Sequence, residues 1–142
     1  MARIEFRVEC VLFNGEGSLL LALHEKKGKS YWVLPGGHVD HYERMEAALK
    51  RELKEELGAN NVHVQDLLYL DEYIDPDASR HVVRAGFLVG LAEKDRAALK
   101  VLAVSEAIQD IRYYSKQEMK ASGDTFYPSK EFFLHLMDVR NG

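Results

Sequence analysis

The stretch Met45–Leu57 reads MEAALKRELKEEL, and its spacing predicts an amphipathic helix. At about 100° of rotation per residue, leucines that recur every fourth position fall on one stripe of a helix. The stripe consists of Leu49, Leu53 and Leu57. Gly58 follows directly, and glycine is suited to the left-handed conformation that ends many helices. We therefore expect a helix that ends at Leu57 and packs its leucine stripe against the core.

Three carboxylates lie on the arc beside the leucine stripe, namely Glu52, Glu55 and Glu56. Like charges at such spacings repel one another, and partial burial raises the cost of keeping a carboxylate ionised. A bound divalent cation removes both penalties, because hard ions prefer carboxylate oxygens. The arc therefore predicts metal-dependent chemistry. A solvated helix face is the alternative for an isolated E-x-x-E-E pattern.

Length and composition favour a single globular domain over residues 1–142, with 46% hydrophobic and 30% charged residues. The net charge of −4 gives no general attraction to nucleic acid or to anionic membranes, so an anionic substrate must be held locally. The single cysteine, Cys10, lies in an apolar run and cannot form an internal disulfide. No apolar stretch predicts a signal peptide or a membrane span, so we expect a cytoplasmic protein.

Hydrophobic patterns on either side of the helix predict a mixed set of strands and helices. Ile4 to Phe13 alternates apolar and charged residues, and a turn joins it to Ser18 to His24, which predicts a hairpin. Asp40 and Glu43 have the spacing of a capping box before the helix. The other expected elements are strands at 31–34, 62–73, 81–91 and 107–114 and helices at 115–121 and 129–139.

A longer motif surrounds the three glutamates. Five residues separate Gly37 from Glu43, seven more lead to Arg51, and 51–59 reads RELKEELGA. This pattern resembles the Nudix box, G-x5-E-x7-R-E-U-x-E-E-x-G-U, in which U is aliphatic. Every fixed position is filled, although the last holds the small Ala59. The resemblance implies an α+β fold, the Nudix-type α/β/α sandwich with a mixed β-sheet.

The same resemblance implies a metal-dependent pyrophosphohydrolase. Such enzymes cleave a nucleoside diphosphate linked to another group, and they require Mg²⁺ or Mn²⁺. The implied ligands are the side chains of Glu52, Glu55 and Glu56 and a backbone carbonyl at Gly37 or its neighbour Gly36. Such ions make a bound water acidic and offset charge on phosphate oxygens, which agrees with the chemistry of the arc.

Further roles follow from the resemblance. Glu55 is the first candidate for the general base and Glu52 the second. Glu43 and Arg51 are expected to pair and so fix the loop against the helix. An additional acidic ligand from outside the motif is expected at Glu106 or Asp110.

Three side chains outside the motif are candidates for binding the nucleotide. Arg84 and His24 would contact phosphate or ribose if they face the cleft. Trp32 would stack on a base, with core packing as the alternative. The substrate classes left open are ADP-ribose-like nucleotide sugars and (deoxy)nucleoside triphosphates.

Two other functions remain as alternatives. One is a Nudix-fold regulatory domain that senses a nucleotide without cleaving it, and the other is a purely structural interaction module. The complete motif favours an active enzyme over both. Homodimers are common in the family, and the sequence leaves the oligomeric state open.

Overall fold

The computed structural model describes residues 3–102 and 108–141. Within these ranges the strands are β1 (Ile4–Val11), β2 (Leu19–Lys26), β3 (Lys29–Val33), β4 (Gly36–His38), β5 (His63–Asp75), β6 (Arg80–Gly90) and β7 (Ile108–Tyr114). The helices are α1 (Met45–Leu57), α2 (Glu93–Ala97), α3 (Lys116–Ala121) and α4 (Lys130–Asn141).

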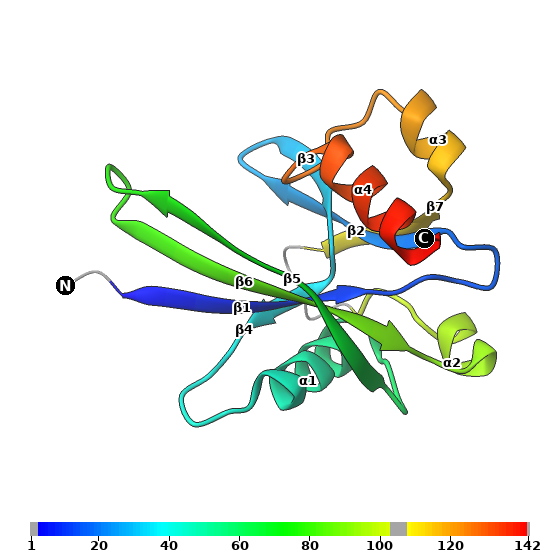
Figure 1. Cartoon of the computed structure of the whole chain (residues 1–142), viewed down its shortest axis with the longest axis horizontal. Coiled ribbons are helices and arrows are strands. Elements are labelled where there is room, and N and C mark those ends of the chain that lie inside the picture. The colour runs from blue at the N-terminus through cyan, green and yellow to red at the C-terminus, as the bar shows by residue number, and fades with distance from the viewer. Residues whose placement is uncertain (1–2, 103–107, 142) are drawn as a thin grey trace.

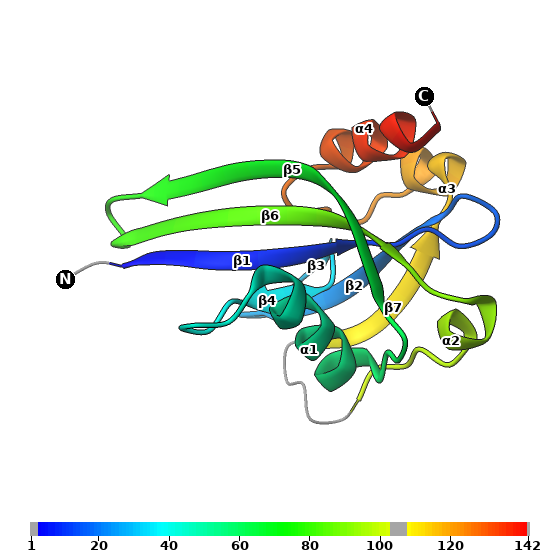
Figure 2. The ribbon, with the colours of Figure 1, turned by 60° about the horizontal axis from the view of Figure 1, so that its bottom comes forward.

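The strands form two sheets, of order β4-β1-β6-β5 and β3-β2-β7. β1 runs parallel to β6 and antiparallel to β4, so the four-stranded sheet is mixed. α1 lies on one side of the sheets and α3 and α4 lie on the other, as Figure 1 shows. The long strands β1, β5 and β6 extend past α1 and α4 at one end of the molecule (Figure 2). The expected α+β sandwich with a mixed sheet is confirmed.

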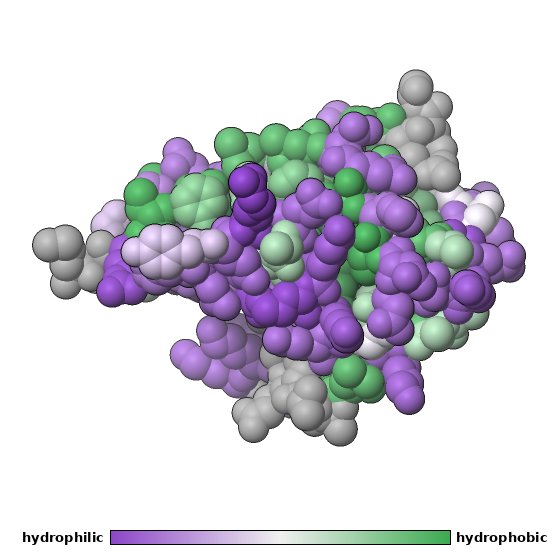
Figure 3. All heavy atoms as spheres, turned by 90° about the horizontal axis from the view of Figure 1, so that it is seen from below, coloured by the Kyte–Doolittle hydropathy of each residue, from purple (hydrophilic) through white to green (hydrophobic). Residues whose placement is uncertain are grey.

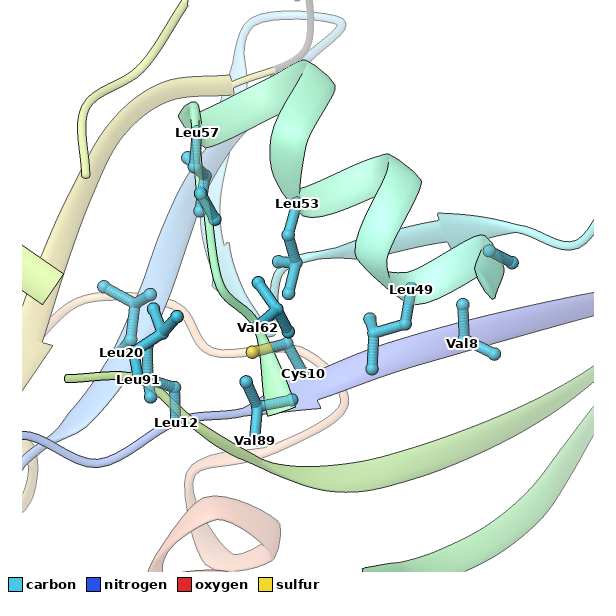
Figure 4. Close-up of a cluster of buried hydrophobic side chains, with 12 residues drawn as sticks. Val8, Cys10, Leu12, Leu20, Leu49, Leu53, Leu57, Val62, Val89 and Leu91 are labelled. Carbon is cyan, nitrogen blue, oxygen red and sulfur yellow. The ribbon is translucent and has the colours of Figure 1, made fainter. Parts of the chain in front are cut away.

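The leucine stripe of α1 forms one core of the protein. Leu49, Leu53 and Leu57 are at most 2% exposed. They point from the helix toward β1, where Val8 and Cys10 are fully buried (Figure 4). The helix ends as expected, because Gly58 adopts the left-handed conformation at φ 67° and its N–H bonds to carbonyls of the last turn. The buried stripe thereby fixes which arc of α1 carries the glutamates.

A second core joins α3 and α4 to the three-stranded sheet. Its fully buried members include Tyr114 from β7, Met119 from α3 and Phe133 from α4. The predicted strand before Tyr114 and both predicted helices are confirmed. Ser115 caps α3 through a full capping box with Glu118, and the Ser129 hydroxyl accepts the Phe132 N–H at 3.1 Å at the start of α4.

The predicted hairpin of the first two strands is wrong. β1 pairs with β6 along its whole length and with β4 over Arg7 to Glu9, whereas β2 pairs with β3 and β7. Only the isolated bridge between Phe13 and Leu19 links the two segments. The predicted alternation also fails, because Ile4 and Phe6 lie beyond the cover of α1 and are exposed, whereas Glu9 is buried.

Two short elements and one cap differ from expectation. Gly36 and Gly37 begin a short strand that was not predicted, β4, which pairs with β1. α2 was not predicted. The capping box is wrong at its first residue, because Arg44, not Asp40, is the N-cap of α1, although the Glu43 carboxylate accepts the Asp40 N–H at 3.0 Å. None of the described helices is long and apolar enough to cross a membrane.

Candidate active site

The three glutamates of α1 have different environments although they share one arc. The side chain of Glu52 is 15% exposed and that of Glu55 is 58% exposed. Glu56 is largely buried, and one of its carboxylate oxygens, Oε2, has no hydrogen-bond partner within residues 3–102 and 108–141. Figure 3, which views the molecule from the α1 side, shows that hydrophilic residues dominate this face. The arc therefore offers one accessible, one packed and one buried carboxylate.

Arg51 joins the loop before α1 to the arc. Its guanidinium donates to both oxygens of Glu43, at 2.8 and 3.0 Å, and to the carbonyl oxygen of His38 at 3.0 Å. It also donates to Glu52 at 2.9 Å and to Glu55 at 3.4 Å. The Arg51 hydrogen bonds lower the pKa of Glu43 to about 2, so Glu43 stays ionised. The expected contact between Glu43 and Arg51 is present, and it holds the loop against the helix.

Gly37 lies directly beneath the carboxyl group of Glu52. A Cβ added at this position would overlap the Glu52 carboxyl atoms. At Gly36 an added Cβ would overlap the backbone carbonyl oxygen of Val8 in β1. The missing side chains thus let the β4 backbone approach both the sheet and the first glutamate of the arc.

Burial changes the acidity of Glu56. Loss of hydration and the nearby charge of Glu52 raise the pKa of the Glu56 carboxyl to about 7, and Arg7 opposes this shift. A buried carboxylate oxygen without a donor is a costly feature that a cation would satisfy. The carboxylate oxygens are also the donors that Mg²⁺ and Mn²⁺ prefer. The residues of the arc therefore fit a divalent cation.

In residues 3–102 and 108–141, no three His, Cys, Asp or Glu side chains converge closely enough to hold an ion as they stand. The Arg51 guanidinium bonds to both Glu52 and Glu55, so a cation would compete with it for these carboxylates. Of the two acids expected from outside the motif, Glu106 lies outside the described residues. Asp110 is exposed on β7, and its carboxylate accepts the Ile111 N–H at 2.8 Å.

A cavity of about 850 Å³ opens on the other face of the four-stranded sheet. Side chains alternate across β1, so Val8 and Cys10 face α1 whereas Arg7 and Glu9 line the cavity. The basic residues that line it are Arg7, Lys26, Lys29, Arg80 and Arg84, and the aromatic ones are Tyr31, Tyr73, Phe126 and Tyr127. Cations and aromatic rings in one cavity suit the phosphates and the base of a nucleotide.

Arg84 and His24, the candidates for contacting phosphate or ribose, both line this cavity. Arg84 is 8% exposed, and its guanidinium pairs with both oxygens of Asp71 at 3.0 and 3.1 Å. Burial, and then the charge of Arg7, lower the pKa of His24. Neutral His24 therefore offers a hydrogen bond to a ligand rather than a charge.

Trp32 does not line the cavity. It is 7% exposed and packs edge-on against Tyr114, with ring centroids 5.3 Å apart. Its backbone N–H and carbonyl also bond to the segment at Thr125 and Tyr127. Core packing, the alternative for this residue, therefore accounts for its position.

Glu9 was missed as a candidate for the site. The alternating pattern of β1 placed it among the solvent-facing charges, yet it is 8% exposed and lines the cavity. The Tyr69 hydroxyl donates a hydrogen bond to Glu9 Oε1. The sequence does show a charged residue within a strand. It does not show that other parts of the protein cover both faces of that strand, so the burial of Glu9 could not be predicted.

Comparison with known proteins supports this picture. A nucleoside triphosphatase NudI of Klebsiella pneumoniae is 26% identical over 121 residues, which span 80% of this chain and 84% of the relative. An RNA pyrophosphohydrolase of Wolbachia pipientis is 42% identical over 57 residues, which span 40% of this chain and only 35% of the relative. The second match therefore covers about a third of that protein.

Solved structures share the fold at low identity. The MutT protein of Methanosarcina mazei superimposes with a TM-score of 0.75 at 20% identity, covering 99% of this chain and 96% of that one. The E. coli ORF135 protein gives a TM-score of 0.74 at 20% identity, covering 98% and 92% of the two chains. Residues 5–136 match the NUDIX domain. The chain therefore belongs to the NUDIX domain family, and it is a hydrolase of that family.

Proposed function

We propose that this Nudix hydrolase is a metal-dependent pyrophosphohydrolase that acts on nucleotides. The observation that carries the proposal is the arc of α1, where Glu56, beside Glu52 and Glu55, has a buried oxygen that no described residue bonds to. These side chains would hold Mg²⁺ or Mn²⁺, with a backbone carbonyl at Gly37 as a further ligand. When bound there, such an ion would neutralise charge on the diphosphate and make a bound water more acidic.

The residues of the chain divide the remaining work. Glu55 is the accessible carboxylate, so it accepts the proton of the attacking water, and Glu52 is the second candidate for this role. The ion pair between Glu43 and Arg51 holds the loop before α1 against the arc. The cationic side chains of the cavity take the phosphates. Among the described residues, Arg7, Lys26 and Lys29 form no ion pair, so their charge is available to a ligand.

Of the two substrate classes, we favour (deoxy)nucleoside triphosphates over ADP-ribose-like nucleotide sugars. The relative that spans most of this chain is named a nucleoside triphosphatase. The negative net charge gives no general affinity for nucleic acid, so the substrate is a small nucleotide. We expect the protein to be cytoplasmic, because its single cysteine is buried and free.

Product analysis tests the proposal. The protein is incubated with nucleoside triphosphates and with ADP-ribose, with Mg²⁺ or with a chelator. We expect nucleoside monophosphate to form with Mg²⁺ and not with the chelator. Nucleotide binding without any product would instead support a sensing domain, and metal-independent hydrolysis would contradict the assigned role of the arc.

A further inference from the structure

Glu9 is a buried acid that the proposed hydrolysis does not use. It lies in the wall of a cavity whose other charged lining residues, among those described, are all basic. A phosphate group next to a carboxylate is repelled, so the part of a ligand that faces Glu9 carries no negative charge. If the substrate is a nucleotide, as proposed above, that part is the base.

The pairing of β1, β6 and β5 fixes the position of the Glu9 carboxylate. Glu9, Gly86 and Tyr69 are direct neighbours across β1, β6 and β5 and share one face of the sheet. A Cβ at Gly86 would overlap the Tyr69 ring, so the glycine gives the phenol room to reach Glu9. The ring also packs edge-on against Phe132, with centroids 5.0 Å apart. Tyr69 therefore orients Glu9 through its hydroxyl.

The surroundings of Glu9 suit a nucleotide base. The positive charge of Arg84 acts on Glu9, and the same guanidinium lies 5.5 Å from the centre of the Tyr127 ring. Tyr127 lines the cavity and is 44% exposed, so its ring is open to stacking. Arg7 also lines the cavity, and its positive charge opposes the rise in the pKa of Glu9.

The chemistry of a carboxylate selects among bases. Its two oxygens accept hydrogen bonds and cannot donate any when ionised. Guanine presents two adjacent donors, N1–H and the N2 amino group, whereas cytosine and adenine place an acceptor beside their amino group and uracil flanks its donor with carbonyls. Burial raises the pKa of Glu9, and two donors would favour its ionised form. Guanine is therefore the base that fits Glu9 best.

We propose that Glu9, oriented by Tyr69, reads the Watson–Crick edge of guanine and makes this cavity selective for guanine nucleotides. Glu9 is then a specificity residue that contacts substrate, and Tyr69 is a positioning residue. Hypoxanthine differs from guanine only by lacking the N2 amino group. The pair GMP and IMP therefore isolates one hydrogen bond to Glu9.

Calorimetry of nucleoside monophosphate binding, with a chelator present, tests the proposal without relying on turnover. The full chain is titrated with GMP, IMP and UMP. We expect GMP to bind at least about tenfold more tightly than IMP, the effect of one hydrogen bond to a charged acceptor. In Glu9→Gln the ratio should fall to about one, because the new amide offers a donor where guanine needs an acceptor.

Two further variants complete the experiment. Tyr69→Phe keeps the ring packed on Phe132 and removes only the hydroxyl, so its preference for GMP should be reduced while its melting temperature stays close to that of the native protein. Glu16→Gln makes the same chemical change on an exposed turn and should keep the full preference.

Equal affinity of the native protein for GMP and IMP, or binding of neither, overturns the inference, even if the protein hydrolyses nucleotides. An unchanged GMP preference in Glu9→Gln also overturns it. A GMP preference that depends on Glu9, in a protein that forms no product with Mg²⁺, would support the role of Glu9 and contradict the proposed hydrolysis. The two proposals therefore fail in distinguishable ways.

Discussion

The three glutamates on α1 are chemically similar, and their environments give them different tasks. Glu55 is exposed and accessible to water, whereas Glu52 packs on Gly37 and bonds to Arg51. Glu56 is largely buried, and its Oε2 has no partner in the part of the chain that the structure describes, which makes it the carboxylate that gains most from a cation. The residue that accepts a proton must contact water, so we assign Glu55 as the base and Glu56 as the more deeply buried metal ligand.

Glu55→Gln should therefore lower kcat by at least about a hundredfold, because the amide cannot accept the proton of the attacking water. The exposed side chain has little packing to lose, so the melting temperature should stay within about 2 °C of that of the native protein. Glu46→Gln is the matched control on the same helix, since Lys50, at 3.3 Å, is the one ion-pair partner of Glu46 among the described residues. Native turnover in Glu55→Gln would reject Glu55 as the base.

Glu56 makes the stability of the metal-free protein depend on pH. Its pKa is about 7 in the folded protein and near 4.5 when unfolded, so the folded state binds the proton more tightly. Stability therefore falls as pH rises from 4.5 to 7, and the cost is fully present above pH 7. Glu56→Gln should raise the free energy of unfolding by about 1–3 kcal/mol at pH 8, with a much smaller difference at pH 4.5.

Thermal unfolding in the presence of a chelator measures this effect at both pH values. Equal melting temperatures of Glu56→Gln and the native protein at pH 8 would show that burial does not strain the ionised carboxylate.

The candidate site could be predicted from sequence only where one element carries it. Helical spacing placed Glu52, Glu55 and Glu56 on one arc, because α1 alone determines that geometry. Glu9 and Tyr69 meet through strands that are 60 residues apart in sequence, and nothing local records this pairing. The burial of Glu9 likewise depends on cover from distant segments, so a local alternating pattern placed it on the wrong side.

At the scale of elements, local signals predicted α1, β5, β6, β7, α3 and α4, whose bounds agree with expectation to within a few residues. The hairpin failed because strand pairing is a tertiary property. β1 finds β6 in parallel, and this long-range partner displaces the neighbour that follows in sequence. β4 was missed because glycines normally weaken a strand, whereas here they permit close approach.

The two glycines of β4 give contrasting predictions. At Gly37 a methyl group would push aside the flexible end of Glu52, so Gly37→Ala should fold, change stability by less than about 1 kcal/mol, and lose at least about tenfold in kcat. At Gly36 the methyl group would meet the β1 backbone, so Gly36→Ala should lose at least about 2 kcal/mol of stability. Denaturant unfolding and steady-state kinetics measure both effects. The reverse ranking would contradict the packing of β4.

At the scale of the whole molecule, the cavity lining and the chain as a whole have charges of opposite sign. The chain carries −4, yet the described lining of the cavity is strongly basic, whereas the three glutamates of the arc lie on α1. The sheet separates these two regions, and Arg7 influences groups in both. The basic and aromatic side chains of the cavity would hold a nucleotide there, which accounts for a site for anions in an acidic protein.

Calorimetric titration with Mn²⁺ at pH 7.5 tests the central claim most directly, because the whole account requires the arc of α1 to bind a divalent cation. We predict measurable uptake by the native protein, an affinity at least about tenfold lower in Glu56→Gln, and no change in Glu46→Gln. The absence of any heat of Mn²⁺ binding, with or without a nucleotide present, would contradict the account.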